Sequence, residues 1–70
     1  GRSLKIYDLD GNLLENIPMT MLKGRMELLF VAPGGHVFIG EADENIWYLD
    51  KAEIGTGAVR IRLLTQEGYQ

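Results

Sequence analysis

The chain has 70 residues, enough for one small domain over residues 1–70. Apolar residues make up 46% of it and cysteine is absent, which excludes a fully disordered chain, a disulfide-stapled fold and a cysteine-ligated zinc site. The net charge is −3, and Arg60 and Arg62 are the only close basic pair on a predicted strand, so we expect no nucleic-acid partner.

No apolar run is long enough to cross a membrane, and no basic segment followed by an apolar run marks a signal peptide. We therefore expect a soluble protein with no membrane partner, and the sequence assigns it to no compartment. The segment Gly1-Arg2-Ser3 is interpreted as a cloning remnant or a fragment boundary. Residues 66–70 are expected to form a polar tail.

Nine glycines and two prolines break the chain into short segments. These segments are rich in Ile, Leu, Val, Phe, Tyr and Trp, the composition typical of strands. They predict an all-β fold, a small antiparallel meander with at most one helical turn. The six predicted strands are Leu4–Leu9, Leu13–Ile17, Met26–Ala32, His36–Glu41, Asn45–Leu49 and Ala58–Leu64.

Turn residues occupy the gaps between these strands. Asp10-Gly11-Asn12 and Pro33-Gly34-Gly35 each close a hairpin, because Gly and Asn accept positive φ and Pro presets a negative one. Asp43-Glu44 is expected to close a third hairpin. Lys51–Gly57 is a longer connection, and Met19–Gly24 is the one stretch for which both a single helical turn and a loop are open.

The middle strands carry apolar side chains on both faces. Leu29 and Phe30 alternate between the two faces of their predicted strand, and Trp47 and Tyr48 alternate in the same way. Strands that are apolar on both faces need cover on both. A short chain without helices has nothing to place on the second face, so we expect a homo-oligomer or a protein partner.

The large aromatic residues are expected in the core, and an exposed group of them would indicate a contact surface. The expected core aromatics are Phe30, Phe38, Trp47 and Tyr48. The candidate residues for contact with a partner are Leu29, Trp47 and Phe38.

A repeat is visible at an offset of 40 residues. Ile6-Tyr7-Asp8-Leu9-Asp10 lines up with Ile46-Trp47-Tyr48-Leu49-Asp50, and each copy runs into a glycine-bearing turn. The chain resembles β-propeller blades, whose units contain four strands in about 40–45 residues. The resemblance implies that residues 30–64 form one blade and residues 4–17 two strands of a preceding blade. A small barrel or another antiparallel domain is the alternative, since one and a half blades cannot close a propeller.

The segment from Ile6 to Leu14 also resembles the first motif of haloacid-dehalogenase-type phosphatases, in which a strand delivers two aspartates ahead of a glycine. The resemblance implies that Asp8 is the nucleophile and Asp10 the acid/base, with Mg²⁺ neutralising charge. Asn12 stands where that family usually has a threonine, and the family's parallel sheet with crossover helices does not fit this chain. We prefer a hairpin turn in which an aspartate caps its own backbone.

Other chemical sites are weaker still. Asp8, Asp10 and Asn12 alternate as in a calcium loop, but the glycine and the glutamate that such a loop needs are out of register. His36 is the only histidine, and no phosphate-binding loop or catalytic triad is present. We therefore predict no catalytic residue, no metal site and no cofactor.

These observations predict a non-enzymatic structural or interaction module that self-assembles or packs on further β units. The alternative is a small metal-dependent phosphohydrolase-like protein that uses Asp8 and Asp10. Stabilisation by Mg²⁺ or Ca²⁺ that is lost in Asp8→Asn would support the alternative, because binding to the native state raises its stability.

Overall fold

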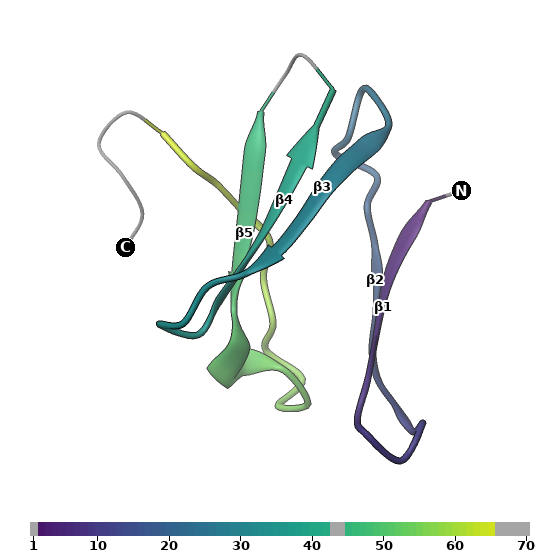
Figure 1. Cartoon of the computed structure of the whole chain (residues 1–70). Helices are drawn as coiled ribbons and strands as arrows, with labels where there is room; N and C mark the ends of the chain where they lie inside the picture. Colours follow the sequence, from purple (N-terminus) through teal and green to yellow (C-terminus); the bar gives the residue numbers. More distant parts are fainter. Residues whose placement is uncertain (1, 43–44, 66–70) are drawn as a thin grey trace.

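The computed structural model describes residues 2–42 and 45–65, and for Leu28 the backbone alone. The strands are β1 (Ser3–Tyr7), β2 (Leu13–Pro18), β3 (Met26–Val31), β4 (His36–Glu41), β5 (Ile46–Asp50) and β6 (Arg62–Leu63). They form a two-stranded sheet, β1-β2, and a four-stranded sheet in chain order, β3-β4-β5-β6 (Figure 1). Every pairing is antiparallel, so the all-β antiparallel prediction is confirmed. The predicted turn at 43–44 and tail at 66–70 lie outside the described residues.

The last strand is shorter than the sequence predicts. The predicted strand Ala58–Leu64 is reduced to β6, two residues that pair with β5. The segment before β6 is held by side-chain hydrogen bonds and not by backbone pairing with β5. The Glu53 carboxylate accepts hydrogen bonds from the Arg60 N–H and from the Arg62 guanidinium. The alternating pattern of this segment therefore reflects partial burial and not sheet pairing.

Of the two interpretations left open for Met19–Gly24, a helical turn and a loop, the structure has the loop. Met19–Gly24 forms turns and bends, whereas a 3₁₀ turn, η1 (Lys51–Glu53), begins the predicted long connection. Asp50 caps η1, since its side chain accepts a hydrogen bond from the Ala52 N–H at 2.9 Å. Gly55 then turns the chain with a φ of 80°, which a residue without Cβ adopts at no steric cost.

Glu41, at the end of β4, explains why the segment before β3 does not form a helical turn. Its buried carboxylate accepts hydrogen bonds from the backbone N–H groups of Lys23 and Gly24, at 2.8 and 3.0 Å, through Oε2. Its Oε1 accepts from the indole Nε1 of Trp47 at 2.9 Å. These hydrogen bonds, that of Gly24 first, lower the pKa of Glu41 to about 2. Because the Lys23 and Gly24 amides donate to this carboxylate, the segment before β3 stays irregular, and these hydrogen bonds attach it to β4.

The hydrophobic core lies between the four-stranded sheet, the β1–β2 hairpin and the segment just after β2. Its buried members are Leu4, Met19, Leu22, Val37, Ile39 and Leu49. Burial of one such side chain contributes about 1.5–3 kcal/mol. Met19, Ile39 and Leu49 are the largest side chains that are completely buried, so the two layers and the segment that joins them all depend on this one cluster.

The aromatic residues divide between the core and the surface. Tyr48 is buried and Trp47 packs against the core, while Phe38 is half-buried. Phe30 is 52% exposed, so its expected place in the core is wrong. The reason is its position in the sheet: β3 is an edge strand and has a neighbour, β4, on one side.

Candidate functional site

The exposed edge strand β3 is the most unusual surface of the protein. Leu29, Phe30 and Val31 are 56%, 52% and 58% exposed, although they are consecutive residues whose side chains alternate between the two faces of the sheet. Strand β3 pairs with β4 and with no other strand of the described chain. We call these three residues the β3 surface. An unpaired apolar edge is a template on which another strand can add.

Little protects this edge against such pairing. Proteins usually blunt an exposed edge with lysine, proline or an inward-pointing charge. The charged residue of β3 is Glu27, which lies near the start of the strand and forms an exposed ion pair with Arg25 at 3.1 Å. The apolar half of β3, from Leu29 to Val31, is therefore left without a charge or a proline of its own.

An apolar groove runs between the β3 surface and β1. Figure 1 shows the β1–β2 hairpin beside β3, and the groove between them has a volume of about 360 Å³. Two exposed lysines, Lys5 and Lys51, also line this β1–β3 groove. The apolar lining residues are Leu4, Ile6, Tyr7, Leu29, Val31, Val37 and Ile54. The groove thus offers an apolar floor and positive charge in a protein of net negative charge.

A second hollow continues the groove towards the tip of the β1–β2 hairpin. It shares Ile6, Tyr7, Lys51 and Ile54 with the first and has a volume of about 550 Å³. Leu9 forms part of its rim and is fully exposed. A leucine therefore projects entirely into solvent beside an apolar hollow at this end of the molecule.

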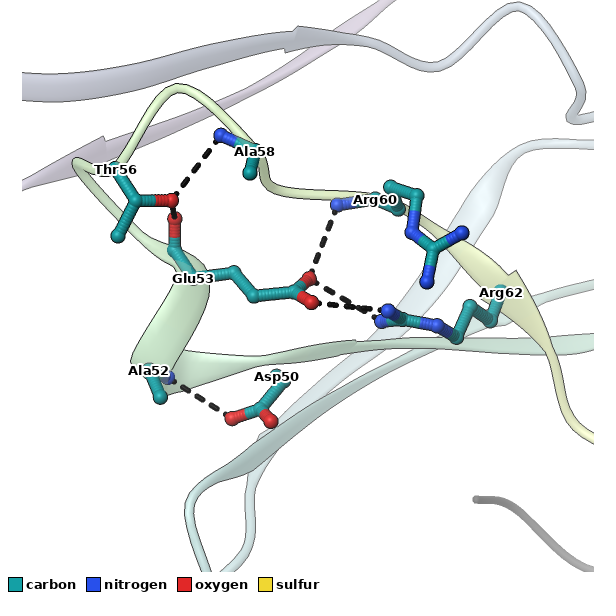
Figure 2. Close-up of polar contacts among 7 residues, drawn as sticks. All are labelled: Asp50, Ala52, Glu53, Thr56, Ala58, Arg60 and Arg62. Carbon is teal, nitrogen blue, oxygen red and sulfur yellow. Dashed lines mark hydrogen bonds and ion pairs between the residues drawn. The ribbon is translucent and has the colours of Figure 1, made fainter.

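A polar cluster holds the connection that contributes Ile54 to the groove. Figure 2 shows the Glu53 carboxylate facing the guanidinium of Arg62, with Oε2–Nη2 and Oε1–Nη1 distances of 2.9 and 3.2 Å. The Arg62 side chain lowers the pKa of Glu53, and Glu53 in turn raises the pKa of Arg62. Thr56 accepts a hydrogen bond from the Ala58 N–H in the same loop. Arg62 is therefore committed to an intramolecular ion pair and does not form a basic patch.

The two aspartates of the phosphatase-like motif lie in the first hairpin turn. The Asp8 Oδ1 accepts hydrogen bonds from the N–H groups of Asp10 and Asn12, both at 2.9 Å, and Oδ2 accepts from the Asn12 side chain at 3.0 Å. These hydrogen bonds, first that of the Asn12 side chain, lower the pKa of Asp8. Gly11 follows with a φ of 89°. The geometry is that of an aspartate that caps its own turn, the interpretation preferred from the sequence.

No metal site accompanies these aspartates in the described residues, since no group of three or more His, Asp or Glu side chains there could hold an ion. The three candidate contact residues are placed apart. Leu29 belongs to the β3 surface, and Phe38 lies on the other face of the sheet between the rings of Phe30 and Tyr48, at 6.5 and 6.2 Å. Trp47 packs against the core and donates to Glu41.

Sequence reasoning missed the two lysines and the β1 wall of the groove. Lys5 and Lys51 are 46 positions apart, and nothing in their local sequence links them. They line the same groove because the hairpin packs against the sheet, and this packing is a tertiary event. A signal did exist for Leu9, a leucine between two aspartates at a turn, where an apolar side chain has no core to enter.

Comparison of the chain with protein-family models, with curated proteins and with solved structures gives no match. Within the described part of the chain, no helix is long and apolar enough to cross a membrane.

Proposed function

We propose that the chain is a non-enzymatic interaction module that binds a further β unit along β3, the partner being a second copy or another protein. The observation that carries the proposal is the β3 surface, where three consecutive apolar residues are each more than half exposed on an edge strand that pairs on one side with β4 and has no second neighbour among the described strands. Backbone groups at the free edge supply hydrogen bonds to an added strand, and the alternating side chains supply apolar contact.

The size of the surface supports a contact of modest strength. Three half-exposed side chains of this kind offer roughly 300 Å² of apolar area, which is the size of patch that marks interaction sites on monomers. A standard interface buries about 800 Å² per partner, so the β1–β3 groove has to take part as well. We expect association in the micromolar range.

The resemblance to propeller blades fits within this proposal. A four-stranded antiparallel sheet in chain order is the unit of a β-propeller, and β3 to β6 have that order. Blades are stabilised by packing on neighbouring sheets, and the β1–β2 hairpin packs on one face of the four-stranded sheet in this way. A further β unit at β3 would instead lengthen the four-stranded sheet at its free edge.

The test is the mass of the protein in solution, measured by light scattering from low to high micromolar concentration. We expect the wild type to associate, and Leu29→Lys and Phe30→Lys to weaken the association, because each places a charge on the β3 surface. Leu13→Lys is the matched control, a half-exposed leucine of another edge strand. Amide hydrogen exchange adds a second readout.

If β3 receives a strand, the amides of Leu29 and Val31 become protected as the concentration rises. Association that is unaffected by Leu29→Lys and Phe30→Lys, with no change in β3 exchange, would contradict the proposal. A lysine variant that fails to fold is recognised by circular dichroism. Leu29→Thr and Phe30→Thr, which keep strand propensity, then take its place.

A further inference from the structure

The tip of the β1–β2 hairpin and the β1–β3 groove have complementary properties. Leu9 is fully exposed at the tip, and the hollows beside it are lined by apolar side chains such as Ile6 and Ile54. An apolar hollow of several hundred cubic ångströms has room for a projecting leucine and is apolar like it.

Charges at the two places are opposite. Asp10 follows Leu9 directly and is exposed, while Lys5 and Lys51 line the groove. The other aspartate of the tip, Asp8, has both carboxylate oxygens engaged by its own turn. Asp10 is therefore the acid at the tip that is placed to meet a cation on another molecule.

We propose that the partner is a second copy of this chain, which inserts Leu9 into the β1–β3 groove and brings Asp10 to Lys51 and Lys5. The inference rests on the proposed function, because Leu29 and Val31 of the β3 surface form one wall of that groove. It goes further by naming the partner and the residues that it contributes.

A two-fold axis makes this contact self-consistent. Leu9 lies on the rim of the second hollow, so the projecting residue and its receiving surface are neighbours on one molecule. An axis that passes between them lets each copy insert its own Leu9 into the other, so both contacts form twice. Each half buries an apolar side chain that is otherwise in water, and the charges set the orientation.

The first experiment removes the apolar tip. Leu9→Ser should raise the dissociation constant of the dimer about tenfold or more in sedimentation equilibrium, since one apolar anchor is lost from each half of the contact. Leu13→Ser is the matched control, because Leu13 is also an exposed leucine of this hairpin but lies outside both hollows. Equal affinities of Leu9→Ser and wild type would overturn the inference, and so would a wild type that stays monomeric at high micromolar concentration.

The second experiment exchanges the charges. Asp10→Lys and Lys51→Glu should each weaken the dimer severalfold, and the double variant should recover most of the loss. Both residues of this design are exposed, so the fold is retained, as circular dichroism will verify. Losses that simply add in the double variant would contradict the contact between Asp10 and Lys51.

Failure of this inference is distinguishable from failure of the proposed function. If the β3 amides become protected with concentration but Leu9→Ser has no effect, the β3 surface binds a partner in another way and the inference is overturned. If Leu9→Ser weakens the dimer while Phe30→Lys and the β3 exchange do not respond, the tip contact stands and strand addition at β3 is wrong.

Discussion

Strands β3 and β4 are neighbours with similar apolar sequences and opposite surroundings. Leu29 and Val31 pair directly with Ile39 and Val37 across the sheet, yet the first two are 56% and 58% exposed and the second two are 0% and 8% exposed. The difference in exposure comes from which strand is packed against other segments of the chain. The β1–β2 hairpin and the segment that follows it cover β4 and leave β3 at the margin. An apolar strand is therefore buried or exposed according to its place in the sheet order.

The largest effect on stability should come from truncating a buried side chain of β4. Ile39→Ala is expected to lower the free energy of unfolding by about 3 kcal/mol, since it leaves a cavity at a fully buried site. The same truncation at its cross-strand partner, Leu29→Ala, should cost less than about 1 kcal/mol in the monomer. Urea unfolding at low protein concentration measures both. Equal losses at the two positions would contradict the contrast between β3 and β4.

The next largest effect on stability should come from breaking the hydrogen bonds that attach the segment before β3 to Glu41 on β4. Glu41→Gln is expected to destabilise the fold, because the new NH₂ replaces one of two acceptor oxygens. Whichever way the amide turns, this donor faces either the Trp47 indole N–H or the N–H groups of Lys23 and Gly24. The matched control is Glu27→Gln, which alters an exposed ion pair and should change stability by less than about 0.5 kcal/mol. Thermal unfolding of the two variants compares them directly.

Glu41 also predicts a pH dependence whose sign is fixed. Its pKa falls from 4.5 to about 2 in the folded protein, so the native state favours the ionised form. The resulting stability is complete above 4.5 and is lost as the pH falls through that range towards 2. Urea unfolding from neutral to acid pH should show this loss, and Glu41→Gln should reduce its size. A variant with the same acid sensitivity as the wild type would assign the dependence to other carboxylates.

A smaller effect is expected at the polar cluster that supports the groove. Arg62→Lys replaces a two-point contact with Glu53 by a single ammonium contact, so the loop after η1 should open more often. Faster hydrogen exchange at the Arg60 N–H, which donates to Glu53, is the measurement. Arg25→Lys, in the exposed pair with Glu27, is the control and should change little. Unchanged exchange at Arg60 would mean that backbone contacts alone hold this loop.

The smallest effect should be seen when divalent ions are added. Mg²⁺ or Ca²⁺ is expected to leave the thermal midpoint unchanged, because both oxygens of Asp8 are occupied by the turn. Asp8→Asn should lower the midpoint slightly, since one acceptor oxygen is replaced by a donor. A rise with Mg²⁺ that disappears in Asp8→Asn would instead support the phosphohydrolase-like alternative.

Much of the fold could be predicted from local chemistry. The hairpin turns at Gly11 and Gly35 have the positive φ angles that their glycines suggest, and each of the first five strands begins or ends within two residues of its predicted bounds. Such features depend on neighbours in sequence, so they can be read there. The last strand is shorter than predicted, because Glu53 binds the Arg60 amide seven residues along the chain. Met19–Gly24, for which a helical turn and a loop were both open, forms the loop, and Glu41 binds the Lys23 amide in it from 18 residues away.

The candidate site was only partly accessible to the same reasoning. Apolar residues on both faces of the predicted strand Met26–Ala32 indicated that both faces need cover. Leu29, which was predicted as a contact residue from that pattern, is exposed. Phe38 and Trp47 share the pattern but lie among other rings or against the core. Alternation along a strand tells which residues share a face, but it does not tell which face another layer will cover.

By itself, the sequence determined an all-β antiparallel chain with tight glycine turns, no thiol chemistry and more apolar strand surface than one small domain can bury. Only the tertiary structure decided that β3 is the exposed edge, that the Leu9 side chain is fully exposed to solvent, and that Lys5 and Lys51 line one apolar groove. The physical reason is range: strand and turn preferences act over a few residues, whereas burial is decided by how distant segments pack into a finite core.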